Sequence, residues 1–172
     1  MNPIIFLDID GVINPNDIMK FPPVDPDLPK RLANEKENPA IAQLEAFTVM
    51  QAHQCFDRNS IEYLMKLIQE FDCRIVISSS WRLFFTYEEL IAVFDIVDLG
   101  QYVIGVTANT RQPRFSQILD YITLHGIDRY IVIDDFNMSK IFGYRFIHTK
   151  RRMLLKDYYM ARTALKTQEH AS

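Results

Sequence analysis

The stretch that most constrains this chain is residues 4–12, an apolar run that leads into Asp-Ile-Asp-Gly-Val. Four apolar residues in a row predict a strand that is buried on both faces, as in a parallel sheet. Asp8 and Asp10 follow on alternate positions, so their side chains point the same way if the strand extends through Asp10. Gly11 lets the chain leave the sheet sharply and pass close to a ligand. Two acids at the carboxyl end of a central parallel strand lie where α/β proteins bind ligands.

Short apolar runs alternate with segments of helical periodicity along the rest of the chain. Asn59 and Thr86 each precede a Glu by three residues, the spacing of a capping box, so helices are expected to begin there. This alternation predicts an α/β fold, a three-layer Rossmann-like parallel sheet with helices on both faces. Strands are predicted at residues 74–77, 102–107, 130–133 and 145–148, and helices at 59–71, 86–97, 113–126 and 153–165.

Polar side chains follow three of the predicted strands. Right-handed crossovers place the carboxyl ends of these strands along one edge of the sheet, so we expect the polar side chains to meet there. Four carboxylates in a partly buried crevice repel one another and require protons or a cation. Oxygen ligands with no nearby His or Cys favour Mg²⁺. The six residues at this edge are Asp8, Asp10, Ser78, Ser79, Asp134 and Asp135.

This set of residues suits phosphoryl transfer. A carboxylate beside Mg²⁺ is ionised at neutral pH and can attack phosphorus without a base. The second acid, Asp10, can protonate a leaving alkoxide and later deprotonate water. Hydroxyl groups of Ser78 and Ser79 can hold phosphoryl oxygens, and one cation should offset their charge. Arg114, at the start of a predicted helix, is the first choice for that cation, and its rivals are Arg82, Arg111 and Lys140.

The motifs together resemble the haloacid dehalogenase (HAD) superfamily of aspartate-nucleophile phosphatases. Residues 8–11 match its first motif, and Ser78 or Ser79 matches its second. Arg114 matches the third, a basic residue that opens a helix, and the acids at 134–135 match the fourth. Order and spacing agree from residue 3 to about residue 150. The Ser-Ser-Trp-Arg run at 79–82 further resembles small HAD domains associated with RNA repair systems.

The resemblance implies a role for each acid. Asp8 would be the nucleophile and a ligand of Mg²⁺. Asp10 would be the acid/base, with its backbone carbonyl on the metal. Asp135 would bind Mg²⁺ directly, and Asp134 would act from outside the coordination sphere of the metal. Family ion pumps carry Thr where this chain has Asp10, so Asp10 favours rapid hydrolysis of the phosphoenzyme.

Residues 13–58 are longer than the short flap that usually follows the first strand in this family. The segment holds six of the eight prolines, and residues 13–40 are predicted to form a surface loop. We interpret 13–58 as a flap or small cap insertion within a single HAD-like domain of residues 1–172. The alternative is that the segment packs as core, since it carries apolar residues at 41, 44, 47, 49 and 50. An open site would suit a bulky substrate such as a phosphoprotein or a nucleic-acid end.

The composition sets limits on partners and location. The net charge of −3 gives no general attraction to nucleic acid or membrane, so a nucleic acid is expected only as a substrate. No apolar run approaches the roughly 18 residues of a membrane span, and the start of the chain does not resemble a signal peptide. Cys55 and Cys73 are expected to be reduced core thiols of a cytoplasmic protein. The sequence does not indicate an oligomeric state.

The leading functional hypothesis is a Mg²⁺-dependent phosphohydrolase that cleaves a phosphate monoester through an aspartyl-phosphate intermediate. A phospho-accepting or ligand-binding module without turnover is the alternative, although all four acids are present. A signalling receiver domain also has an acid pair, but there the pair comes early in the chain. Trp81 is interpreted as a core or lid residue rather than a base-stacking one, and residues 150–152 as a solvated charge run.

Overall fold

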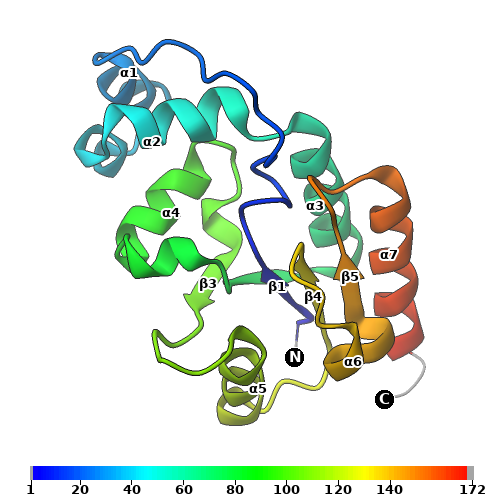
Figure 1. The fold of residues 1–172 in the computed structure, drawn as a ribbon. Coiled ribbons are helices and arrows are strands. Elements are labelled where there is room, and N and C mark those ends of the chain that lie inside the picture. Colours follow the sequence, from blue (N-terminus) through cyan, green and yellow to red (C-terminus); the bar gives the residue numbers. More distant parts are fainter. Residues whose placement is uncertain (1, 170–172) are drawn as a thin grey trace.

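The computed structural model describes residues 2–169 and shows one sheet of five parallel strands in the order β3-β2-β1-β4-β5 (Figure 1). The buried apolar runs of the sequence form these strands, and β1 lies in the middle. The predicted Rossmann-like α/β fold is therefore confirmed, with an insertion after β1. The strands are β1 (Ile4–Leu7), β2 (Arg74–Ile77), β3 (Val103–Val106), β4 (Tyr130–Asp134) and β5 (Phe146–His148).

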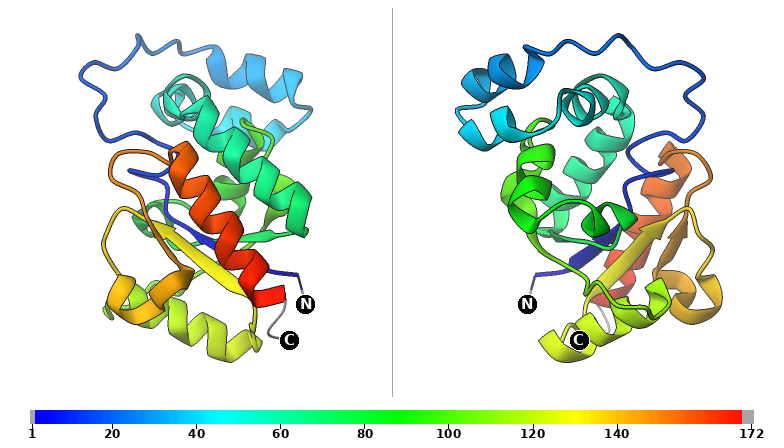
Figure 2. Two further views of the ribbon diagram at one scale, coloured as in Figure 1. Left: turned by 90° about the vertical axis from the view of Figure 1, so that its right-hand side faces the viewer. Right: turned by 60° about the vertical axis from the view of Figure 1, so that its left-hand side comes forward.

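Helices cover both faces of the sheet (Figure 2). The helices α3 (Arg58–Phe71), α4 (Tyr87–Asp95) and α7 (Leu155–Glu169) bury apolar residues against one face. On the other face, α5 (Arg114–His125) and α6 (Ser139–Phe142) enclose a smaller core. Three short 3-10 helices complete the connections: η3 (Ser80–Leu83), η4 (Gly100–Tyr102) and η5 (Gly143–Arg145). Among residues 2–169, no helix is both long and apolar enough to cross a membrane.

The strand register aligns side chains in rows across the sheet. Phe6 lies beside Val76 and Val132, and these three residues pack in the core that α5 covers. The ladder continues one residue past β1 and β2, because Asp8 N donates to the carbonyl of Ile133 at 3.0 Å and Ser78 N donates to that of Leu7 at 2.9 Å. Side chains two residues apart on a strand share a face. The next row, Asp8, Ser78 and Asp134, therefore also faces α5.

The insertion between β1 and α3 is helical and lies beyond one end of the sheet (Figures 1 and 2). Its apolar residues Ile41, Val49 and Met50 are fully buried and join the larger core. The alternative of core packing is thus confirmed for these residues and for the buried Leu44, but it is wrong for Phe47, which is 41% exposed. Its two ends meet where Asp57 N donates to the carbonyl of Ile13 at 2.7 Å. The elements are α1 (Leu28–Glu35), the 3-10 helix η1 (Pro39–Gln43), α2 (Ala46–Met50) and the π-helix η2 (Gln51–Cys55).

Two expectations about the helices and the long loop are wrong. The loop predicted over residues 13–40 contains α1, which buries Leu28 and Leu32. The expected start at Asn59 is also wrong, because the side chain of Asp57 caps α3 by accepting a hydrogen bond from Ser60 N at 2.8 Å. The capping box at Thr86 is confirmed, with both of its reciprocal hydrogen bonds present.

Candidate active site

Three carboxylates meet at the carboxyl edge of the sheet. Asp8, Asp134 and Asp135 each place an oxygen within 4.8 Å of the other two. Asp8 and Asp134 are buried, and Asp8 Oδ1 has no hydrogen-bond partner within the described chain. Oxygen donors gathered this closely, one of them unpaired, fit a hard divalent cation such as Mg²⁺. The sequence-based expectation that these strand ends converge is confirmed for these three acids.

Arg114 is the cation that the structure brings to the acids. It is the first residue of α5, and its Nη1 donates to Asp8 Oδ2 at 2.9 Å and to Asp134 Oδ2 at 2.7 Å. Two of the three rivals, Arg111 and Lys140, have exposed side chains. The start of a helix that leads into β4 therefore delivers a positive charge to the row of acids.

Burial changes the protonation of this pair of acids. Burial raises the pKa of Asp134 to about 6, the charge of Asp8 adds to the rise, and Arg114 opposes it. Burial also raises the pKa of Asp8, again against the opposing charge of Arg114. Arg114 therefore does not fully offset the effect of burial on either pKa, although the guanidinium of Arg82 also interacts with both acids.

Asp10 lies apart from the group of three. The strand ends at Leu7, and the carbonyl of Ile9 accepts the N–H groups of Val12, Ile13 and Asn14, which turns the chain. Asp8 and Asp10 would point the same way only if the strand extended through Asp10, and it does not. Asp10 Oδ1 instead accepts a hydrogen bond from Asn14 Nδ2 at 2.6 Å, and Oδ2 accepts one from Trp81 Nε1 at 2.9 Å.

Gly11 is required by the position of Asp135. Gly11 has φ +72°, a left-handed conformation that favours glycine, and an added Cβ would lie 2.5 Å from Asp135 Oδ2. The Asp135 side chain also accepts a hydrogen bond from Asn16 Nδ2 at 3.1 Å. The turn after β1 and the end of β4 thus fit against each other at the site.

The serines predicted to hold phosphate have different surroundings. Ser79 Oγ accepts a hydrogen bond from Trp81 N at 3.4 Å and caps η3. Ser78 Oγ is buried and unpaired among the described residues, as is the hydroxyl of Thr107 on the neighbouring strand end. Ser78 belongs to the row beside Asp8, and a hydrogen bond from the Ser79 side chain lowers the pKa of Asp8, so both serines lie next to this carboxylate.

Sequence reasoning missed the network behind Ser78. Arg82 Nη1 donates to the carbonyl of Ser78 at 2.9 Å and to that of Ser79, and Nη2 donates to Gln117 Oε1 on α5. Gln117 Nε2 donates in turn to the carbonyls of Thr110 and Gln112 at 3.1 and 2.7 Å. Arg82 therefore holds the backbone that follows β2. Thr107 could have been noticed, because it ends the strand predicted at 102–107.

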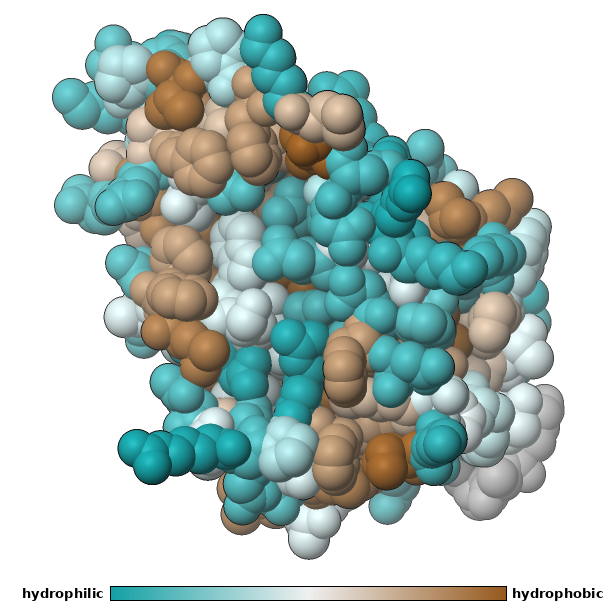
Figure 3. All heavy atoms as spheres, in the orientation of Figure 1, coloured by the Kyte–Doolittle hydropathy of each residue, from teal (hydrophilic) through white to brown (hydrophobic). Residues whose placement is uncertain are grey.

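Hydrophilic side chains run down the middle of the face drawn in Figure 3, between more apolar areas.

A family model described as "HAD domain in Swiss Army Knife RNA repair proteins" matches residues 4–159. The match contains every candidate site residue. No curated protein and no solved structure matches the chain.

Proposed function

Because the chain belongs to the HAD domain family of Swiss Army Knife RNA repair proteins, we propose that it is a Mg²⁺-dependent phosphohydrolase acting on a phosphorylated nucleic-acid end. The observation that carries the proposal is the group of Asp8, Asp134 and Asp135 with Arg114 against it. The family's association with RNA repair favours a nucleic-acid end over a phosphoprotein as the substrate.

The hydrogen bonds around the acids support an assignment of the residues that would bind Mg²⁺ directly. Both oxygens of Asp134 already accept hydrogen bonds. Oδ1 accepts one from Phe136 N at 2.8 Å, and Oδ2 accepts one from Arg114. Asp8 keeps one unpaired oxygen, and among the described residues the side chain of Asp135 accepts a single hydrogen bond. Asp8 and Asp135 would therefore hold the metal, together with the backbone carbonyl of Asp10. Bound Mg²⁺ would neutralise carboxylate and phosphoryl charge.

The chain's own residues then carry out two displacements. Asp8 attacks phosphorus, the bond to the leaving oxygen breaks, and Asp10 gives that oxygen its proton. Asp10 next takes a proton from water, whose oxygen attacks the phosphorus of the aspartyl phosphate and releases Asp8. Arg114 and the hydroxyl of Ser78 hold the phosphoryl oxygens through both steps.

The test is phosphate release by the purified protein. Substrates are 3′- and 5′-phosphorylated oligonucleotides, a phosphopeptide and p-nitrophenyl phosphate, each with Mg²⁺ and with EDTA. We expect release from an oligonucleotide, loss of release in EDTA, and a fall of more than about 10⁴-fold in Asp8→Asn. Comparable turnover by pure, folded Asp8→Asn would refute the mechanism. Mg²⁺-dependent oligonucleotide binding without phosphate release would indicate the alternative, a module without turnover.

A further inference from the structure

The carboxylate of Asp10 is held on both sides by groups that can only donate. The indole N–H of Trp81 occupies Oδ2, and the amide N–H of Asn14 occupies Oδ1. An indole nitrogen cannot accept a proton, and neither can the amide nitrogen of Asn. A proton on Asp10 can therefore be exchanged only with a third group, such as a leaving oxygen or water.

Trp81 is itself fixed in place. Its side chain is buried, and its ring packs against Phe56 at 6.0 Å and Phe85 at 5.4 Å between centroids. Its carbonyl accepts hydrogen bonds from the N–H groups of Phe84 and Phe85. A buried indole normally finds an acceptor for its N–H, and here that acceptor is the side chain of Asp10. The indole cannot leave Asp10 without opening the core around it.

The connection links the segment after β2 to the turn after β1. Trp81 lies three positions after Ser78 and two after Ser79, and Asp10 lies two positions after the candidate nucleophile Asp8. One side chain thus sets the distance between the candidate acid/base and the residues that would hold phosphate. Asn14, at the start of the insertion, supplies the second restraint.

We propose that Trp81 is a positioning residue that orients Asp10 for proton transfer to and from substrate oxygen. The proposal rests on the proposed phosphohydrolase function. Trp81 does not touch the reacting atoms. It acts through Asp10, by holding one carboxylate oxygen so that the other lone pairs face the leaving group.

The kinetic test uses Trp81→Phe, which keeps an aromatic ring between Phe56 and Phe85 but removes the donor. We expect kcat/KM for an oligonucleotide phosphate to fall about 10–100-fold. The fall should be much smaller for p-nitrophenyl phosphate, whose leaving group needs no proton. Tyr158→Phe, which removes a polar group from an aromatic ring on α7 that stacks on Tyr63, is the control and should change neither value. Equal losses for both substrates would overturn the proposal.

A double-mutant cycle separates positioning from a general loss of structure. If Trp81 acts only through Asp10, then Trp81→Phe should add no further loss to Asp10→Asn. Multiplied losses in the double variant would mean that Trp81 acts by another route, and the proposal would fail.

A second readout does not depend on activity. Trp81 is the only tryptophan in the chain, so tryptophan emission reports its surroundings alone. Asp10→Ala should shift that emission, whereas Asp135→Ala, which removes another carboxylate from the same site, should not. An emission shift in a protein without phosphatase activity would support the Trp81–Asp10 contact while the proposed function fails. Unchanged emission in Asp10→Ala would overturn the contact itself.

Discussion

At the scale of single residues, the two neighbouring acids at the end of β4 are not equivalent. Asp134 faces α5 and is fully buried with donors on both oxygens, whereas Asp135 is partly exposed and lies against Gly11. Asp135→Asn should therefore raise the Mg²⁺ concentration for half-maximal turnover by about 10–100-fold, more than Asp134→Asn does. Titration of Mg²⁺ against activity in both variants measures this. Equal shifts would show that the metal ligands are wrongly assigned.

The raised pKa of Asp134 predicts how Mg²⁺ and pH act together. Protonation of Asp134 below about pH 6 weakens the negative field of the group, so Mg²⁺ should bind less well there. We expect the rise in melting temperature caused by Mg²⁺ to be largest above pH 7 and to shrink as the pH falls through 6. Thermal melts with and without Mg²⁺ at pH 5 and pH 7.5 test this. A rise of equal size at both pH values would contradict it.

Without Mg²⁺, the same group gives the opposite trend. The folded protein keeps a proton on Asp134 that the unfolded chain releases above about pH 4. The contribution of this proton to the free energy of unfolding is therefore fully present below about pH 4 and is lost as the pH rises through about 6. In Asp134→Asn this contribution should be absent, which makes that variant the control.

At the scale of secondary structure, the sequence predicts elements whose signal is local. The four-residue apolar runs and the Thr86–Glu89 capping box predicted strands and a helix start that the structure confirms. The start of α3 was misplaced because Asp57 caps it from two positions before Asn59. Helix α1 was missed because eight residues with few apolar positions, in a proline-rich stretch, give a weak periodic pattern. Pro29 lies in the first turn of α1, where proline is tolerated, so a high proline content does not by itself exclude a helix.

The candidate site also contains features with a local sequence signal and features without one. Asp8, Asp134, Asp135 and Arg114 each stand at the end of a strand or the start of a helix, so topology alone brings them together. The contact of Trp81 with Asp10 depends on how two connecting segments pack, and no local pattern in the sequence predicts it.

The helical insertion makes its own prediction. Deletion of residues 22–39 removes α1 with its buried residues Leu28 and Leu32, so it should lower the free energy of unfolding by about 2–5 kcal/mol. Chemical denaturation of the deletion variant measures this loss. An unchanged free energy of unfolding would contradict the core role of α1.

A milder change tests whether the insertion selects substrates. Met19 is 99% exposed and Phe21 is 44% exposed, so their replacement by Ser should leave the core intact. If this surface contacts large substrates, the double variant should have a higher KM for an oligonucleotide and the same KM for p-nitrophenyl phosphate. Unchanged kinetics on both would remove this loop from the functional account.

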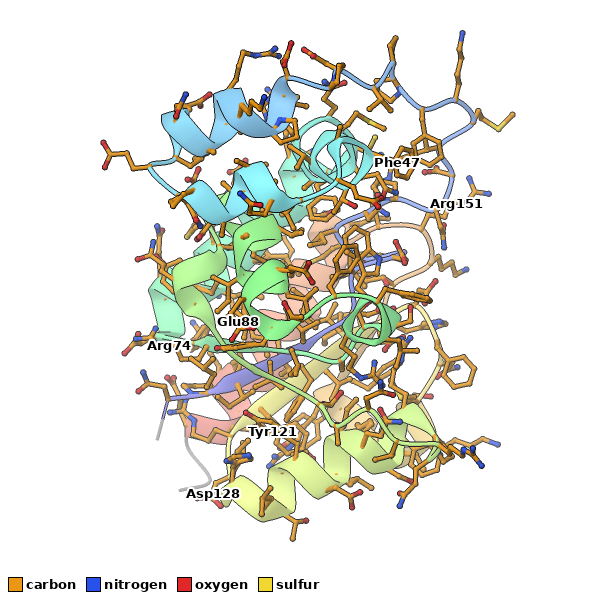
Figure 4. All side chains as sticks on the ribbon, turned by 90° about the vertical axis from the view of Figure 1, so that its left-hand side faces the viewer. Phe47, Arg74, Glu88, Tyr121, Asp128 and Arg151 are labelled. Atoms are coloured by element: carbon orange, nitrogen blue, oxygen red, sulfur yellow. The ribbon has the colours of Figure 1, made fainter. Side chains whose placement is uncertain are left out.

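At the scale of the whole molecule, the strand order decides which parts of the chain share the site. With β1 between β2 and β4, the three strand ends that carry Asp8, Ser78 and Asp134 are immediate neighbours. The loop before α7 lies against the turn after β1, because Thr149 Oγ1 donates to the carbonyl of Gly11 at 2.8 Å. Arg152 of this loop contacts Asp17 at 2.9 Å and Asp57 at 3.4 Å. Arg151 of this loop lies near the insertion in Figure 4, and its guanidinium is 3.7 Å from Asp17. Lys150 and Arg151 are exposed, as expected for a solvated charge run, whereas Arg152 is partly buried and its charge pairs connect this loop to the insertion.

The meeting of the insertion's two ends at Ile13 and Asp57 has a consequence for how this chain can diverge during evolution. A segment that leaves and returns at one place can grow, shrink or be exchanged without moving the strands on either side, because loop-closure entropy rises slowly with length. Its replacement must still pack against α4, which contacts η1 and whose Asp95 accepts a hydrogen bond from Asn38 Nδ2 at 2.6 Å. Related domains can therefore differ in the residues between Asn16 and Asp57 while Asn14, Asn16 and the acids at the strand ends stay in place.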